Sequence, residues 1–150
     1  LNNQLTDFSF SPTNADGTAA ANAVAPGKRP RSSMAPVIVL DRKNRFIAGL
    51  GSPGGSSILA YNLKTLVAVL DWHMPMQEAV ALPNMISRGE TYSAELNLFS
   101  PQIVSGLSDK GVTLKASGIG EVSGLHGIIR RPGGYEGGAD PRREGEVMGE

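Results

Sequence analysis

The sequence has 150 residues, with 14 basic and 14 acidic side chains that cancel, and it contains no cysteine. The balanced charge argues against sequence-independent binding of nucleic acid, and the missing cysteines exclude disulfides, thiolate metal sites and a cysteine nucleophile. No apolar run is long enough to span a membrane, and a chain of this length can bury a single core.

The first part of the chain, residues 3–31, is predicted to be a long extended loop. It is rich in Asn, Ser, Thr, Pro, Gly and Ala and shows neither helical nor strand periodicity. The usual loop has ~4–6 residues, so this one indicates a function or packing against a partner. Because the chain starts at Leu1 without a start signal for an element, we expect a piece of a longer protein, either a processed subunit or a truncated form.

Strands and a helix are predicted next. Residues 36–40 form a continuous apolar run that predicts a strand buried on both faces, and residues 46–50 predict its hairpin partner. A helix capped by Ser56 or Ser57 is expected to end near Asp71. Its apolar face is predicted from helical spacing of Leu59, Leu63, Leu66, Val67 and Leu70.

Later elements are shorter. Pro75 predicts a short helix over residues 76–82, and Ser100-Pro101 predicts a further helix that stops before Gly111. Two more strands are expected at residues 112–115 and 125–130. The tail from residue 131 is expected to be rich in turns, at Gly133-Gly134 and at Gly137-Gly138. This mixture predicts an α+β fold rather than a regular βαβ array.

The most informative motif is GSPGGSS, residues 51–57, between the predicted hairpin and helix. The backbone N–H groups of Gly54 and Gly55 carry no shielding side chain, and a helix N-terminus adds a partial positive charge there. Such a turn can hold a phosphate or the oxyanion of a reacting amide. A phosphate loop would need a lysine or a third glycine after Gly55, and neither is present. A tight strand–helix connection without a function remains the alternative.

Two polar pairs in the N-terminal loop are candidate ligand contacts. Gln4 and Asp7 offer acceptor oxygens that suit an ammonium group, and a simple Asx-type turn at Asp7 is the alternative. Ser32 and Ser33 follow the basic cluster at residues 28–31, so their hydroxyls could bind a carboxylate. A solvated basic loop is the alternative for that pair.

The other titratable residues receive no catalytic role. Nothing near His73 or His126 builds a metal site or a Ser–His pair, so no metal or cofactor is predicted. Glu136, Asp140 and Glu144 are expected to be solvated in the tail, at most paired with a neighbouring arginine. Exposed pairs of that kind add little stability.

Taken together and in order, these segments resemble gamma-glutamyltranspeptidases. The matching stretches are LNNQLTDFS at residues 1–9, PGKRPRSSMAP at residues 26–36, GSPGGS at residues 51–56 and the ending GGADPR at residues 137–142. Several ordered motifs at family-like separations are more specific than any one of them. The resemblance implies part of a four-layer α/β/β/α sandwich of the N-terminal-nucleophile hydrolases.

The resemblance also implies an activity. Members are proenzymes that cut themselves into a large and a small subunit, and the new N-terminal threonine of the small subunit attacks the γ-glutamyl amide of glutathione or a related compound. Residues 1–150 would then be a single incomplete domain, the C-terminal portion of a small subunit without its nucleophile segment, and inactive alone. The expected partners are the large subunit, the missing N-terminal segment and a small γ-glutamyl substrate, in a periplasmic or secreted protein.

The resemblance assigns three pairs of residues to three roles. Gly54 and Gly55 would form the oxyanion hole. Ser32 and Ser33 would bind the α-carboxylate of the substrate, and Gln4 and Asp7 would bind its α-ammonium group. Ser57 stands where many members carry arginine. The alternatives are a related acylase for glutaryl or poly-γ-glutamyl amides and a non-catalytic anion-binding module.

Overall fold

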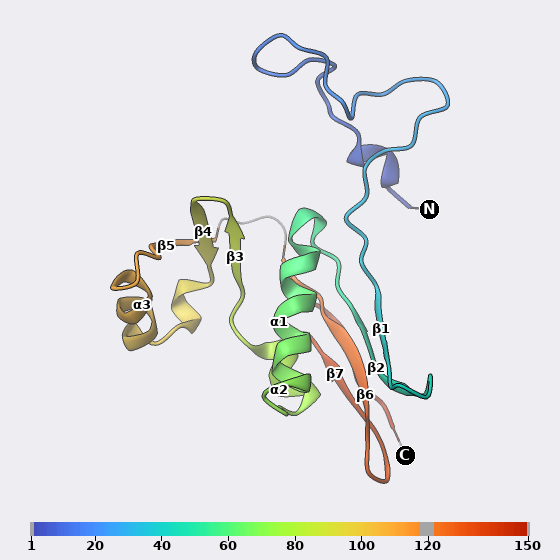
Figure 1. The fold of residues 1–150 in the computed structure, drawn as a ribbon, viewed down its shortest axis with the longest axis vertical. Helices are drawn as coiled ribbons and strands as arrows, with labels where there is room; N and C mark the ends of the chain where they lie inside the picture. Colours follow the sequence, from blue (N-terminus) through green and yellow to red (C-terminus); the bar gives the residue numbers. More distant parts are fainter. Residues whose placement is uncertain (1, 118–121, 150) are drawn as a thin grey trace. The chain divides into compact units, whose positions relative to one another are not determined.

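The computed structural model describes residues 2–117 and 122–149, and the chain divides into two compact units (Figure 1). The N-terminal unit is Leu1–Ser33 and the C-terminal unit is Met34–Glu150. Each unit is described by itself below.

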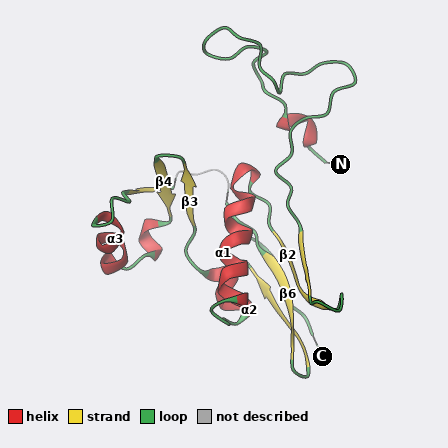
Figure 2. Ribbon diagram, in the orientation of Figure 1, coloured by secondary structure: helices red, strands yellow, loops and turns green. Residues whose placement is uncertain are grey.

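The N-terminal unit is mostly loop (Figure 2). Its one described helix is the 3-10 helix η1 (Gln4–Asp7), and isolated bridges join Ser9 to Ala23 and Thr13 to Ala19. Phe8 and Ala20 are the buried apolar side chains among its described residues. The predicted extended loop is therefore confirmed, apart from the short turn at its start.

The C-terminal unit is built on an antiparallel sheet with the strand order β1-β2-β6-β7 in the described chain. Its strands are β1 (Val37–Leu40), β2 (Phe46–Gly51), β6 (His126–Arg131) and β7 (Gly134–Ala139). The β1–β2 hairpin and β6 confirm the sequence predictions, with small shifts at the ends. β7 was not predicted, because its glycines resemble turn residues; Gly137 and Gly138 are paired with β6 instead.

Two helices, α1 (Ile58–Leu70) and α2 (Met76–Ala81), cover one face of this sheet (Figure 1). The core contains Leu50, Val69, Met76 and Ile129 among others. Met76 packs closely because the facing strand positions are Gly127 and Gly138; a Cβ on either would lie within 3.0 Å of Met76 atoms. Glycine at these positions thus allows α2 to approach the sheet.

A smaller sheet has the order β3-β4-β5 among the described strands. β3 (Met85–Arg88) pairs antiparallel with β4 (Thr91–Ala94), which pairs parallel with β5 (Leu114–Ala116). The short helices η3 (Leu96–Leu98) and α3 (Pro101–Ser108) connect β4 to β5. The predicted start of α3 is confirmed, because the Ser100 side chain accepts a hydrogen bond from the Ile103 N–H at 3.3 Å. Residues 85–94 were not predicted to form strands.

One prediction about burial, that of β1, is wrong. β1 pairs with β2 alone among the described strands, so it is an edge strand, and Ile38 on its open face is 72% exposed. In α1 the predicted apolar face is divided: Leu66 and Leu70 pack against the core, whereas Leu59 and Leu63 are each 63% exposed. Across residues 2–117 and 122–149, no helix combines the length and the apolar character needed to cross a bilayer.

Candidate active site

The glycine motif forms a tight turn between β2 and α1. After Gly51 the chain passes through Ser52 and Pro53 into the 3-10 helix η2 (Gly55–Ser57), which continues as α1. Gly54 has φ of +127° and Gly55 has φ of +52°. A Cβ at Gly54 would lie 2.6 Å from Cε2 of Tyr61, so both the backbone conformation and the space require glycine here.

Ser52 ties the turn to a segment far along the chain. Its hydroxyl donates to the Pro53 carbonyl oxygen at 2.6 Å and accepts from the Gly124 N–H at 3.0 Å. Within the turn, the Ser57 N–H donates to the Gly54 carbonyl oxygen at 3.0 Å. The turn is therefore held on both sides of Pro53.

Ser57 occupies the N-cap position of α1, but its side chain makes no capping hydrogen bond, so the predicted cap through Ser57 is wrong. The side chain is buried, and its hydroxyl accepts a hydrogen bond from a guanidinium nitrogen of Arg88 at 2.9 Å. Arg88 comes from β3, so a cation from another element lies beside Ser57. No local sequence pattern predicts this contact.

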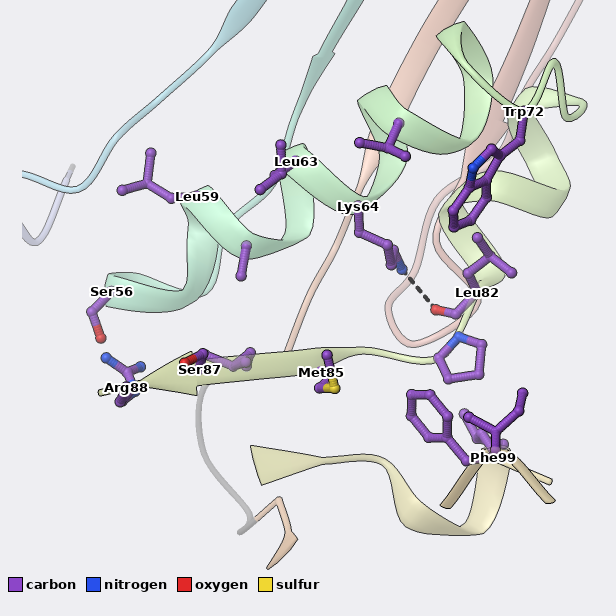
Figure 3. A pocket seen from close by; sticks show the side chains of 16 residues that line it. Ser56, Leu59, Leu63, Lys64, Trp72, Leu82, Met85, Ser87, Arg88 and Phe99 are labelled. Carbon is purple, nitrogen blue, oxygen red and sulfur yellow. Dashed lines mark hydrogen bonds between the residues drawn. The ribbon is translucent and has the colours of Figure 1, made fainter. Parts of the chain in front are cut away.

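The exposed apolar stripe of α1 lines a groove of about 800 Å³ between α1, β3 and the region of η3 and α3 (Figure 3). Leu59 and Leu63 lie on its α1 wall, and Phe99 lies on the opposite side. Ser56 and Arg88 lie at the same end of the groove, next to the glycine turn (Figure 3). Part of the predicted apolar face of α1 thus forms the wall of an open groove.

The buried carboxylate of Asp140 binds both neighbours of Gly124, the residue that contacts the glycine turn. One oxygen of Asp140 accepts hydrogen bonds from the Ser123 hydroxyl at 2.7 Å and the Leu125 N–H at 3.1 Å. The other oxygen accepts from the Arg142 N–H and guanidinium, both at 3.0 Å. Arg142 also forms an ion pair with Glu95 at 2.6 Å. Asp140 is only 1% exposed, so the expectation that it is solvated is wrong, whereas the expected pairing with a neighbouring arginine is confirmed at Arg142.

These contacts explain the ionisation of the network. Burial acts to raise the pKa of Asp140, but hydrogen bonds from Ser123 and Arg142 outweigh it and hold the pKa below the ordinary value. Lys64 donates to the Leu82 carbonyl oxygen at 2.7 Å and to the Asn84 side chain at 2.9 Å. Burial, together with repulsion from Arg142, lowers the pKa of Lys64 to about 8.

In the N-terminal unit, Gln4 and Asp7 are the first and last residues of η1, and both are exposed. The Asx-type bond is made by Asn2, whose side-chain oxygen accepts from the Gln4 N–H at 3.2 Å. Asn22 donates to the Asp7 carbonyl oxygen at 2.6 Å and accepts from the Arg31 N–H at 2.9 Å. Asn22, which the sequence did not single out, therefore links η1 to the loop segment that leads to Ser32.

The structure defines the candidate pairs within their own units. Gln4 and Asp7 share one short turn, and Gly54 and Gly55 share another in the C-terminal unit. Ser32, which is exposed, and Ser33, which is half-buried, end the N-terminal unit. Within residues 2–117 and 122–149, no group of three or more His, Asp or Glu side chains is arranged to hold a metal ion.

Comparison with known proteins gives one consistent result. The profile of the family described as Gamma-glutamyltranspeptidase matches residues 1–150. The chain is 31% identical to the glutathione hydrolase proenzyme of Bacillus subtilis, over 99% of this chain and 24% of that protein. It is 37% identical to the glutathione hydrolase proenzyme of Escherichia coli, over 95% of this chain and 25% of that protein.

A solved structure extends the likeness to the fold. A mutant gamma-glutamyltranspeptidase from Pseudomonas nitroreducens is 33% identical, with a TM-score of 0.78 over 99% of this chain and 79% of that one. The mixed arrangement of helices and sheet is thus that of an N-terminal-nucleophile hydrolase α/β fold, as the sequence predicted. The chain spans about a quarter of the length of the curated relatives named above.

Proposed function

Since the chain belongs to the gamma-glutamyltranspeptidase family, we propose that it is the later part of a small subunit that transfers or hydrolyses the γ-glutamyl group of glutathione and related amides. The observation that carries this proposal is the glycine turn. Gly54 and Gly55 both adopt left-handed φ where β2 passes into η2 and α1, in a chain matched by the family along its whole length.

In the proposed reaction, a threonine upstream of this chain attacks the γ-carbonyl carbon of the substrate. Its hydroxyl proton passes to its own α-amine, and negative charge develops on the carbonyl oxygen. The C–N bond then breaks, the amine leaves with the proton, and water or an amino acid attacks the resulting ester. The role of Gly54 and Gly55 is to donate their backbone N–H groups to the developing oxyanion, at the positive end of the helical segment.

The remaining candidates hold the head of the substrate. A γ-glutamyl compound carries an α-ammonium and an α-carboxylate group, so its binding site needs both an acceptor set and a donor set. Asp7 and Gln4 offer oxygens to the ammonium group from η1, where both side chains are exposed. The hydroxyls of Ser32 and Ser33 donate to the carboxylate. Asn22 supports this assignment, because it ties η1 to Arg31, immediately before the serines.

The open face of the larger sheet supports the proposed partners. Helices cover one face, whereas Ile38, Leu40 and Ile128 alternate to the opposite face and are between 42% and 72% exposed. A four-layer sandwich would cover this face with a second sheet, supplied by the large subunit and the rest of the small subunit. A periplasmic or secreted location is part of the same proposal.

The test uses the full-length protein with γ-glutamyl-p-nitroanilide and, as a matched substrate, glutaryl-p-nitroanilide, which lacks the ammonium group. We expect faster release from the γ-glutamyl compound. Replacing Asp7 by Ala should raise KM roughly 10- to 100-fold, because a charged hydrogen bond is lost. Asp16→Ala, an exposed carboxylate of the same unit, is the control and should leave KM unchanged.

Other outcomes select the alternatives. A preference for the glutaryl compound would indicate a related acylase, and failure to cleave either compound would indicate a non-catalytic anion-binding module. An unchanged KM in Asp7→Ala would contradict the role of the carboxylate while leaving the assigned reaction intact.

A further inference from the structure

We propose that Ser52 is a positioning residue, which holds the Gly54–Gly55 turn in its reactive shape with the support of the buried carboxylate of Asp140. This inference rests on the proposed function and deepens it. Neither side chain was singled out as part of the site by the sequence motifs, and neither is proposed to contact the substrate.

The first step is the double contact of Ser52. Its hydroxyl donates to the Pro53 carbonyl oxygen at 2.6 Å, which fixes the peptide that carries the Gly54 N–H. The same hydroxyl accepts from the Gly124 N–H at 3.0 Å, across 72 positions of sequence. A single oxygen thus couples the orientation of one donor peptide of the turn to a second segment of the C-terminal unit.

The second step is the packing of that segment against the turn. A Cβ at Gly124 would lie 2.9 Å from Cγ of Pro53, and the Val122 carbonyl oxygen would lie 3.5 Å from a Cβ at Gly54. Tyr61 closes the turn from the α1 side, 2.6 Å from the same Cβ position. The turn is therefore enclosed between α1 and residues 122–124, and any shift of these residues is transmitted to Gly54.

The third step is what fixes residues 122–125. Asp140 accepts from the Ser123 hydroxyl and the Leu125 N–H, on either side of Gly124. Arg143 donates to the Val122 carbonyl oxygen at 2.9 Å. Asp140 itself is held by Arg142, so the end of β7 anchors the segment that contacts Ser52. The left-handed conformations of Gly54 and Gly55 persist only where surrounding contacts determine them, and these contacts do so.

A positioning role predicts a distinct kinetic pattern. Ser52→Ala in the full-length enzyme should rotate the donor N–H groups without touching the residues proposed to bind the zwitterion. We expect kcat for γ-glutamyl-p-nitroanilide to fall roughly 10- to 100-fold with little change in KM. Ser52→Thr keeps the hydroxyl and should retain most of kcat, and Ser105→Ala, an exposed serine on α3, is the matched control.

A second measurement does not depend on turnover. Amide hydrogen exchange of the peptide covering residues 51–57 should become faster in Ser52→Ala and remain unchanged in Ser52→Thr and Ser105→Ala. If Ser52→Ala does not fold, Ser123→Ala provides the same test, with a smaller fall in kcat, because it removes one of the two bonds from the segment to Asp140.

The outcomes separate this inference from the proposed function. A wild-type enzyme that releases p-nitroaniline, together with unchanged kcat and exchange in Ser52→Ala, overturns the inference alone. An equal loss of kcat in Ser52→Thr also overturns it, because the hydroxyl would then not be the cause. A wild-type protein without γ-glutamyl activity overturns both.

Discussion

The two units hold their candidate residues by different means. The N-terminal unit carries Gln4 and Asp7 on a short 3-10 helix, fastened by side-chain hydrogen bonds such as those of Asn22, over few buried apolar groups in its described part. The C-terminal unit carries Gly54 and Gly55 on a turn enclosed by packed elements and backed by a buried ion network. Under the proposed function, the residues that would bind a flexible zwitterion tolerate an adjustable support, whereas the donors that would face a developing charge need a fixed one.

The largest expected effect comes from breaking the fixed support. Asp140→Ala leaves the Arg142 guanidinium with one fewer partner and removes the acceptor for Ser123 and Leu125. Breaking a buried pair in this way typically costs about 3–5 kcal/mol of unfolding free energy. Thermal unfolding of the full-length protein would measure it, with Glu144→Ala, an exposed carboxylate of the same tail, as the control.

Low pH should also show how far the stability depends on the Asp140 carboxylate. The pKa values of Asp140 and Glu95 lie below their ordinary values of 3.8 and 4.5, because hydrogen bonds from Ser123, Arg142 and Asn84 outweigh the effect of burial. Their contribution is fully present above those values and is lost as pH falls through the lowered folded-state pKa values. Asp140→Asn should therefore show a shallower loss of stability below about pH 4 than the wild type. Identical pH profiles would contradict the role of this carboxylate.

An intermediate effect is expected at the turn itself. In Gly54→Ala the new methyl group meets Tyr61 at 2.6 Å and the backbone must keep φ of +127°. We expect a loss of about 1–3 kcal/mol of stability and a fall in kcat larger than any rise in KM. Gly106→Ala is the control, because this glycine lies in α3 with open space around it and should be neutral or slightly stabilising. Equal behaviour of the two variants would remove the distinction between a constrained and an ordinary glycine.

The smallest effect is expected in the N-terminal unit. Asn22→Ala removes the bonds to the Asp7 carbonyl oxygen and the Arg31 N–H, which are both exposed to solvent, so each costs only about 0.5 kcal/mol, the low end of the usual range. The comparison predicts a higher KM for γ-glutamyl substrates with kcat and thermal unfolding of the C-terminal unit nearly unchanged. Measuring both parameters on the same preparation would decide it. A fall in kcat at constant KM would show that the anchors and the oxyanion donors are not supported independently.

The sequence correctly predicted the elements whose boundaries are set by local signals, such as capping residues and apolar runs. Ser100-Pro101 starts α3, and apolar runs at residues 36–40 and 46–50 locate the first hairpin. It missed β7 because the pairing of Gly137 and Gly138 with β6 is a tertiary event that overrides low strand propensity. It predicted a single apolar face for α1 but not its division between the core, at Leu66 and Leu70, and the groove, at Leu59 and Leu63, because an apolar stripe can line a groove as readily as an interior.

For the site, the sequence identified the candidate residues, and their resemblance to the family suggested the proposed roles. Neither revealed the contacts that hold these residues in place. The six candidates follow from motifs in the chain order of a resembling family. No local pattern reveals three of the contacts, because each joins residues far apart in sequence. They are the bond from Ser123 to the buried Asp140, the bond from Gly124 to Ser52 and the bond from Arg88 to Ser57. The nearest available signal was the acid–arginine spacing at Asp140 and Arg142, in a tail predicted to be rich in turns.

The paired glycines of β6 and β7 make a remote part of the C-terminal unit sensitive to single methyl groups. Gly127 and Gly138 face each other across the two strands, directly beneath Met76. An alanine at Gly138 would lift α2 from the sheet. The carbonyl oxygens at the end of that helix would then move away from Lys64 and Arg142, which bind them. Alanine at Gly138 would thus weaken the hydrogen bonds of Lys64 and Arg142 to α2, although no charged residue had been replaced.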